Sequence, residues 1–303
     1  MTELRQVSLG SSNTQISAIG FGAMHLAYES DCTDAVAEQV LHAVIGLGVT
    51  LIDTADRYCR DERDAHSNER QIASALRSYH GDTSSICVAT KGGMLFPDGK
   101  WVRYGKPEHI RTTIRESYVA LGGEQPIALW QYHQLDLNYP LEETLDVVRE
   151  AVDEGLIGHV GVSNFSVDQL ERARQIVDVV SVQNEYSLWW RGAERDGVLE
   201  YCDREGLSFL AWRPLGGKHR ASQLTQHESV ARLAAEKNAS PCQLALAWLM
   251  AQSPRVVPLP GSTSAAHVAD AVKSVALTLD DRELQLLGDA IAEEPPSLRL
   301  ATS

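Results

Sequence analysis

The sequence predicts an α/β protein built as a (β/α)₈ TIM barrel, with an N-terminal β-hairpin and a C-terminal capping helix. Short apolar runs suited to buried strands recur near residues 18–22, 49–52, 86–89, 127–132, 159–162, 179–183, 207–211 and 255–258. Helix-like segments separate them, near residues 34–47, 66–79, 107–121, 141–154, 166–176, 194–205 and 241–252. This alternation implies parallel strands with right-handed crossovers. Eight repeats in 303 residues fit a closed barrel better than an open sheet.

The N-terminal hairpin is predicted from two short runs, residues 7–9 and 15–17, separated by a polar loop that contains Gly10. Several predicted helices end at a glycine, because glycine adopts the left-handed conformation of a helix end at little cost. Gly48, Gly155 and Gly206 occupy such positions.

Two further helices extend the basic pattern. Residues 227–237 form an extra helix after the seventh strand, and residues 280–292 form the C-terminal cap. We find no linker or low-complexity tract, so we expect residues 1–303 to form a single domain.

Composition indicates a soluble globular protein, with 44% hydrophobic and 22% charged residues. The net charge of −14 argues against nucleic acid or an anionic membrane as a partner. No apolar run reaches the ~18–20 residues of a membrane span, and residues 1–5 lack the build of a signal peptide. The five cysteines are scattered without a C-x-x-C pair, which predicts unpaired thiols in a cytoplasmic protein without a metal site. Self-association cannot be read from the sequence.

Polar and aromatic residues collect where the predicted strands end, which is where barrels carry their functional side chains. In strand order they are Asp53 and Tyr58, Lys91, His133, Ser163 and Asn164, Gln183, Trp212, and Pro260-Gly261-Ser262. Each has a structural explanation when taken alone, such as a turn cap, a solvated strand end or a core aromatic. Their occurrence at successive strand ends favours a functional site.

These residue types also make chemical sense together. An ammonium such as Lys91 within ~4–6 Å of a tyrosine lowers its usual pKa of about 10 by roughly one to three units. Asp53 could hold Lys91, and a neutral His133 could position a carbonyl oxygen, so that Tyr58 protonates the oxygen during a reduction. The hydride would come from a cofactor. Asn164 and Gln183 could then bind a carboxamide while Trp212 stacks on a nicotinamide ring.

At this point the sequence resembles the aldo-keto reductases over nearly its whole length. The matching motifs are residues 53–58 (DTADRY), 67–69 (SNE), 89–93 (ATKGG), 131–133 (QYH), 155–165 (GLIGHVGVSNF), 182–187 (VQNEYS), 214–216 (PLG) and 258–262 (PLPGS). Within the family, the Thr-Lys-Gly-Gly and Leu-Ala-Trp-x-Pro-Leu-Gly patterns are similar to those of bacterial pyridoxal reductases and sugar dehydrogenases.

The resemblance implies a barrel that binds NADP(H) or NAD(H) and reduces an aldehyde or ketone, or oxidises the corresponding alcohol. Asp53, Tyr58, Lys91 and His133 match the family's catalytic tetrad, with Tyr58 as general acid. The implied cofactor contacts are Gly22, Met24, Asp53, Ser163, Asn164, Gln183, Trp212, Arg213, Pro214, Leu215, Gly216, Lys218, Pro260, Gly261, Ser262 and Ser264.

Two departures from the family pattern bear on the cofactor. NADPH-preferring members usually place a lysine or arginine after Pro260-Gly261, whereas this chain has no cation there before Lys273. Loss of that charge-assisted contact weakens NADPH binding by about 1.5–3 kcal/mol, so NADH use or dual use is a hypothesis. The second departure is Arg213, which forms a basic loop with residues 218–220. This loop is either a pyrophosphate clamp or lid, or a solvated basic surface.

Two alternatives remain open from the sequence. A cofactor-binding redox sensor or regulatory subunit, like the potassium-channel β-subunits of the same superfamily, need not retain the complete tetrad. A metal-dependent barrel hydrolase would need a cluster such as H-x-H at a strand end, which this chain lacks. The intact tetrad therefore favours an enzyme.

Overall fold

A computed structural model describes residues 4–291, and within them eight parallel strands form the predicted barrel. In spatial order the strands are β12 (Val256–Pro258), β11 (Ser208–Trp212), β10 (Val179–Glu185), β9 (Val160–Ser163), β8 (Leu129–Tyr132), β5 (Cys87–Gly92), β4 (Leu51–Asp53) and β3 (Phe21–Gly22). The barrel closes between β3 and β12, where the backbone nitrogens of Gly20 and Gly22 donate to the carbonyl oxygens of Pro258 and Pro260 at 2.9 and 3.0 Å. The fold prediction is confirmed.

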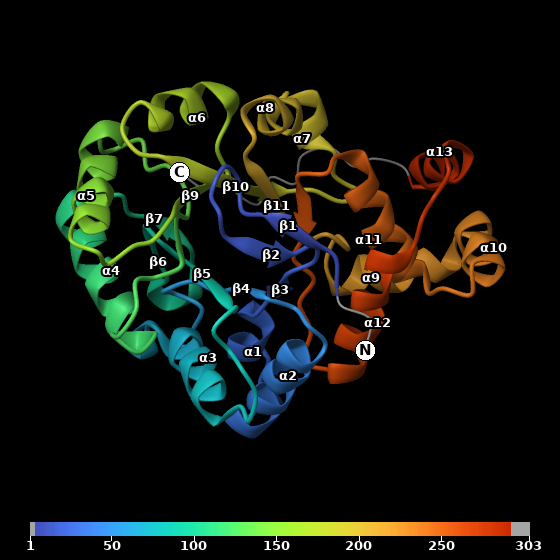
Figure 1. Ribbon diagram of the computed structural model, residues 1–303, viewed down its shortest axis with the longest axis horizontal. Helices are drawn as coiled ribbons and strands as arrows, with labels where there is room; N and C mark the ends of the chain where they lie inside the picture. Colours follow the sequence, from blue (N-terminus) through green and yellow to red (C-terminus); the bar gives the residue numbers. More distant parts are fainter. Residues whose placement is uncertain (1–3, 292–303) are drawn as a thin grey trace.

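The helices surround the strands (Figure 1). They include α2 (Asp34–Gly46), α3 (Ser67–Ser78), α4 (Pro107–Ala120), α5 (Leu141–Asp153), α6 (Val167–Arg174), α8 (Val198–Glu205) and α11 (Pro241–Gln252). The predicted helix at 194–205 is interrupted: a short α7 (Gly192–Arg195) precedes α8, and Gly197 between them has a φ of 73°. Gly155 after α5 has a φ of 76°, the left-handed conformation expected of a glycine at a helix end.

The predicted hairpin is also confirmed, as the antiparallel pair β1 (Gln6–Ser8) and β2 (Gln15–Ser17). It lies at the amino ends of the strands, since the backbone nitrogen of Gly10 donates to Ser208 Oγ at 2.8 Å. A Cβ on Gly10 would lie 2.2 Å from the carbonyl oxygen of Val180, so only glycine fits this approach. Leu9 and Ile16 join the aliphatic side chains that fill the barrel interior.

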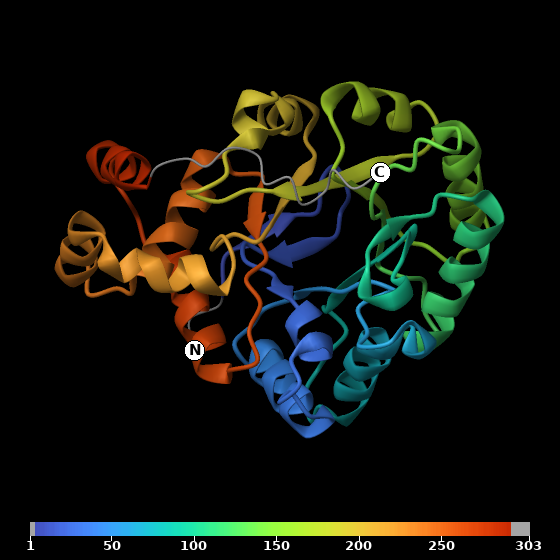
Figure 2. The same cartoon turned by 180° about the vertical axis from the view of Figure 1, so that it is seen from behind.

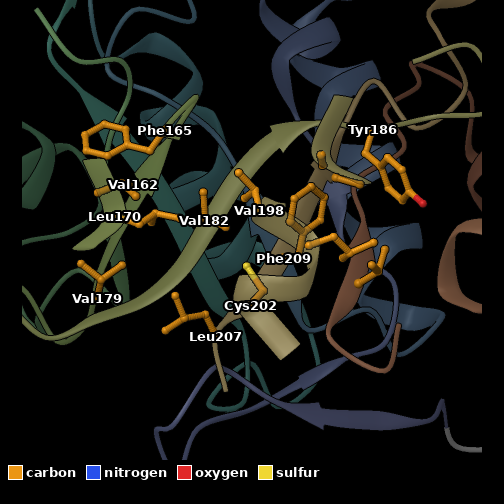
Figure 3. Close-up of a cluster of buried hydrophobic side chains, with 14 of the residues drawn as sticks. Val162, Phe165, Leu170, Val179, Val182, Tyr186, Val198, Cys202, Leu207 and Phe209 are labelled. Carbon is orange, nitrogen blue, oxygen red and sulfur yellow. The ribbon is translucent and has the colours of Figure 1, made fainter. Parts of the chain in front are cut away.

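The largest part of the core lies between strands and outer helices (Figure 3). There Val182 on β10 and Phe209 on β11 belong to the same buried cluster as Val198 and Cys202 on α8. Alternate side chains of these strands point outward to the helices, while the others face the barrel interior. The interior positions near the carboxyl ends are therefore available for polar side chains.

Several short elements lie in segments for which the sequence predicted no helix or strand. They are α1 (Met24–Tyr28), the hairpin of β6 (Met94–Leu95) and β7 (Val102–Arg103), α9 (Lys218–Gln223), α12 (Ala265–Val272), and the 3₁₀ turns η1 (Glu62–Asp64), η2 (Pro97–Gly99), η3 (Leu224–Gln226) and η4 (Lys273–Ala276). The predicted extra helix is α10 (Glu228–Glu236), and the C-terminal cap is α13 (Asp281–Ala290). Residue 292, the expected end of that cap, lies outside the described residues. Both views show α10 and α13 projecting from one side of the barrel (Figures 1 and 2).

Across residues 4–291, every helix is too short or too polar to cross a membrane. The five cysteines are unpaired, as the sequence predicted. Within the same residues no group of three or more histidine, cysteine, aspartate or glutamate side chains could hold a metal ion.

Candidate active site

The four predicted tetrad residues converge at the carboxyl ends of the strands. Asp53 ends β4, Lys91 lies near the end of β5, and His133 directly follows β8. Tyr58 lies on a turn after β4 in which its backbone nitrogen donates to Ala55 O at 3.2 Å. The backbone nitrogen of Asp56, in the same turn, donates to Lys91 O at 2.9 Å and so ties the turn to β5.

Lys91 is the centre of this group and is fully buried. Its Nζ donates to Asp53 Oδ2 and to the carbonyl oxygen of Thr54, both at 2.7 Å, and to the hydroxyl of Tyr58 at 3.3 Å. Burial alone would lower the pKa of Lys91, but the Asp53 carboxylate and Tyr58 raise it overall. The lysine is therefore a charged ammonium in direct contact with the phenol.

The predicted pKa shift of Tyr58 is wrong in direction. Burial raises the pKa of Tyr58 above its usual 10, and the lowering effect of Lys91 is opposed by the neighbouring carboxylate of Asp53. The loss of water around the phenol is the largest of these effects and decides the direction of the pKa shift. Tyr58 is consequently a protonated phenol at neutral pH.

His133 is uncharged in this environment. Burial and then the positive charge of Lys91 hold the pKa of His133 well below its usual 6.5. Its Nδ1 is buried without a hydrogen-bond partner among residues 4–291. The chemistry expected of His133, a neutral imidazole beside the phenol, is compatible with these surroundings.

An aromatic enclosure, which was not predicted from the sequence, covers Tyr58. The ring centroid of Tyr58 lies 6.2 Å from that of Tyr28, 6.3 Å from Trp101 and 6.0 Å from His133. Trp101 also packs against Phe96, with centroids 4.7 Å apart. These rings leave Tyr58 only 8% exposed. A signal existed: Phe96 and Trp101 stand five residues apart in a chain with only 4 Phe and 6 Trp.

The Asp53 carboxylate has amide partners inside the barrel. Gln183 Nε2 donates to Asp53 Oδ1 at 2.7 Å, and Gln131 Nε2 donates to the same oxygen at 3.3 Å. Gln183 was predicted only as a cofactor ligand, whereas here its amide nitrogen also holds the tetrad. Gln131 stands in one of the matching motifs but received no predicted role.

Four predicted cofactor residues are linked by hydrogen bonds beside the tetrad: Ser163, Asn164, Gln183 and Trp212. Ser163 Oγ donates to Gln183 O at 2.8 Å, and Asn164 Nδ2 donates to His133 O at 3.2 Å. Trp212 Nε1 donates to Asn164 Oδ1 at 3.2 Å. Asn164 adopts a φ of 60°, a conformation that asparagine tolerates better than most residues.

Another group of predicted cofactor residues follows β11. Arg213 has a φ of 49°, its Nη1 lies 3.6 Å from Glu185 Oε1, and its Nη2 donates to Gly216 O at 3.1 Å. Pro214 and Leu215 continue this turn, Gly216 has a φ of 68°, and Lys218 begins α9. Residues 218–220 of the expected basic loop are therefore helical, at the start of α9.

The remaining predicted cofactor residues meet where the barrel closes. A Cβ on Gly261 would lie 2.4 Å from Gly22 O, so the two backbones cross closely beside Met24 at the start of α1. Residues 261–266 contain no lysine, arginine, aspartate or glutamate. Ser262 Oγ lies 3.2 Å from His267 Nδ1, and Ser264 N donates to Ser262 Oγ at 3.1 Å. Ser264 then precedes α12 as its N-cap.

Comparisons with known proteins agree on one family. Residues 18–292 match the family model described as the Aldo/keto reductase family. An uncharacterized oxidoreductase of Schizosaccharomyces pombe is 32% identical over 269 residues, which cover 87% of this chain and 83% of that protein. A thermostable aldo-keto reductase solved with the inhibitor epalrestat is 26% identical with a TM-score of 0.80, over 95% of this chain and 100% of the other. An aldo-keto reductase from Klebsiella pneumoniae, solved in complex with NADPH, is 23% identical with a TM-score of 0.80 over 100% of both chains. The predicted family is confirmed: this chain belongs to the aldo/keto reductases.

Proposed function

We propose that this protein is an NAD(P)(H)-dependent oxidoreductase that reduces an aldehyde or ketone, or oxidises the corresponding alcohol, with Tyr58 as the general acid or base. The contact that carries the proposal is Lys91 Nζ, 3.3 Å from the Tyr58 hydroxyl and 2.7 Å from Asp53 Oδ2 in a buried site. Such a group serves to give up a proton from a phenol and to stabilise the phenolate that remains.

In the reducing direction Tyr58 donates its proton to the carbonyl oxygen as negative charge develops there. The raised pKa of Tyr58, caused mainly by burial, keeps the phenol protonated before the reaction. Lys91 stabilises the resulting phenolate, and neutral His133 offers a ring N–H to the same carbonyl oxygen. In the oxidising direction the phenolate accepts the alcohol proton.

The residues at the carboxyl rim suit a nicotinamide cofactor. Such a cofactor supplies the hydride when bound, because no side chain can. Ser163, Asn164 and Gln183 offer hydroxyl and amide groups for a carboxamide, and Trp212 offers a flat ring beside them. The turn from Arg213 to Lys218 offers two cationic side chains and two positive-φ glycines for a pyrophosphate.

We propose that the protein uses NADH, or both NADH and NADPH. The segment around Ser262 and Ser264 presents hydroxyl groups, and Ser262 Oγ lies 3.2 Å from Nδ1 of the nearby His267. Without a cation for the 2′-phosphate, NADPH loses about 1.5–3 kcal/mol of binding. Tryptophan quenching by each reduced cofactor measures both dissociation constants, and a 100-fold preference for NADPH would contradict this proposal.

The test of the function compares Tyr58→Phe with Tyr28→Phe. Tyr28 is the matched control because its ring lies 6.2 Å from that of Tyr58, while its hydroxyl donates to Arg57 O. Loss of reduced-nicotinamide absorbance with a panel of aldehydes and ketones measures turnover, and tryptophan quenching measures cofactor binding. We expect Tyr58→Phe to abolish turnover with cofactor binding retained, and Tyr28→Phe to remain active. Turnover by Tyr58→Phe at the wild-type rate would exclude the acid role.

A further inference from the structure

Inside the barrel, two glutamine side chains form a bridge to the Asp53 carboxylate. Gln131 on β8 is fully buried and Gln183 on β10 is 2% exposed. Both amide nitrogens donate to Asp53 Oδ1, Gln183 at 2.7 Å and Gln131 at 3.3 Å. Gln183 Nε2 also lies 3.4 Å from Gln131 Oε1, so the two amides are linked to each other.

The neighbouring strand leaves room for this arrangement. Gly161 on β9 pairs in register with Gln131. A Cβ at Gly161 would lie 3.0 Å from Gln131 Cγ and 2.4 Å from Ser181 Oγ. A larger residue at 161 would therefore displace the Gln131 side chain from its position below Asp53.

The two carboxylate oxygens of Asp53 have different tasks. Oδ2 accepts from Lys91 at 2.7 Å, whereas Oδ1 accepts from the two glutamines. A buried carboxylate needs donors on both oxygens, since an unpaired oxygen in a dry interior is strongly destabilised. The amide bridge satisfies Oδ1 and so leaves Oδ2 fixed for the ammonium.

We propose that Gln131 is a positioning residue, which together with Gln183 orients the Asp53 carboxylate and thereby holds the Lys91 ammonium against the Tyr58 hydroxyl. Gln131 does not reach the reacting atoms. Its effect passes through Asp53 to Lys91, which contacts both Asp53 and Tyr58. The inference rests on the proposed function, because it concerns the proton that Tyr58 transfers.

Other charged and titratable groups around Tyr58 come from separate elements. Lys91 lies on β5, Asp53 on β4 and Asp56 on the turn that carries Tyr58. His133 after β8 and Tyr28 on α1 have rings near that of Tyr58. A variant at Gln131 changes none of these five residues, so a changed pH profile reports on how Asp53 is held.

Three variants test the proposal by pH profiles of kcat in both directions. Gln131→Met keeps the side-chain length and removes the amide. Gln131→Glu donates to Asp53 when protonated and repels it when ionised. The control is Gln243→Met on α11, which removes a partly buried amide–carboxylate bond to Asp270 Oδ1 (2.6 Å) away from the tetrad.

We expect kcat of Gln131→Met to fall about tenfold, the lower end for a lost hydrogen bond to a charged group, with the cofactor dissociation constant within about twofold of wild type. The part of its pH profile that reports the ionisation of Tyr58 should move to higher pH. The reason is that the Asp53 carboxylate loses a hydrogen-bond donor, so its negative charge acts more strongly on the phenol. Gln131→Glu should be active at low pH and lose activity as the added carboxyl ionises. Gln243→Met should keep the wild-type profile.

The outcomes separate the two proposals. Wild-type protein that binds cofactor but turns over no carbonyl or alcohol overturns the proposed function. Active wild-type protein, with Gln131→Met and Gln131→Glu reduced equally at every pH, overturns the positioning role and assigns Gln131 to packing alone. If Gln131→Glu does not fold, the pH profile of Gln131→Met is the deciding measurement. A Tyr58 ionisation at the wild-type pH in that variant contradicts the inference.

Discussion

Asp56 is a buried carboxylate whose replacement by asparagine should stabilise the protein in a pH-dependent way. Its side chain is fully buried, and neither oxygen has a hydrogen-bond partner among residues 4–291. The nearest cation, Arg57 Nε, lies 3.9 Å from Oδ2. Burial raises the pKa of Asp56 from 3.8 to about 7, partly offset by Arg57.

The magnitude follows from linkage between protonation and folding. Below pH 3.8 both folded and unfolded chains hold the proton, so Asp56 costs nothing there. As the pH rises, the unfolded chain ionises first while the folded chain keeps its proton, and stability falls until the folded pKa is passed. The difference between 3.8 and about 7, at 1.36 kcal/mol per pH unit, amounts to about 4 kcal/mol above pH 7.

Asparagine has the same shape and no charge, so Asp56→Asn should remove this cost. At pH 8 we expect a gain of about 4 kcal/mol, which for a chain of 303 residues raises Tm by about 6 °C. At pH 4.5 the gain should shrink to about 1 kcal/mol, because Asp56 is still protonated in the folded state. Urea unfolding followed by tryptophan fluorescence at both pH values measures the difference.

Asp136→Asn is the matched control. Asp136 is equally buried, but Oδ1 accepts from Asn138 N at 3.0 Å and Oδ2 accepts from Gly105 N at 3.0 Å. Replacing a satisfied carboxylate should lower stability at both pH values, by about 1–3 kcal/mol. If Asp56→Asn also lost stability at pH 8, the reasoning that Asp56 carries an uncompensated charge would be refuted.

Two other substitutions probe the tetrad and its cover. Lys91→Met should lower the free energy of unfolding, measured in urea, by about 3–5 kcal/mol, because it leaves Asp53 as a buried, unpaired charge. Adding Asp53→Asn should restore part of this loss. No recovery in the double variant would contradict the pairing. Trp101→Ala should raise kcat/KM for a bulky ketone relative to a small aliphatic aldehyde, because it opens the enclosure over Tyr58. An unchanged ratio of the two kcat/KM values would show that the Trp101 indole does not limit access of the bulky ketone.

Much of the barrel could be predicted because its elements are long or strongly patterned. The helix at Leu141–Asp153 is predicted by apolar residues at helical spacing and by the glycine that follows. By contrast, α12 is a run of eight residues whose buried side chains, Val268 and Val272 among them, pack against the cluster that includes Leu41 on α2. Its position depends on that distant packing partner, which local periodicity does not reveal.

The candidate site also has a part that could be predicted from the sequence and a part that could not. Asp53, Lys91 and His133 were found because strand ends converge in a barrel, whatever the loops do. The direction of the Tyr58 pKa was missed because burial is a tertiary property: the cation predicted from sequence is present, but Trp101 and its neighbours exclude water from the phenol. The sequence could not show that these rings turn inward from separate short elements.

The catalytic candidates lie on barrel strands, whereas the aromatic enclosure over Tyr58 lies on short rim elements. We therefore expect the strands to determine the reaction rate and the rim elements to determine substrate selectivity. Lys91 and Asp53 sit on strands within the barrel ladder, so their geometry is as rigid as the fold. Trp101 belongs to a hairpin whose strands are two residues each, anchored through Tyr104 N to Gly93 O and through Phe96 N to Glu62 Oε1 at 3.3 Å. Short hairpins at the rim open at lower free energy than the strands of the barrel. Tyr58 is 8% exposed and its ring lies 6.3 Å from that of Trp101, so we expect the position of this hairpin to affect which substrates reach the phenol. Changes in the hairpin should therefore alter which substrates react, and changes in the strands how fast they do.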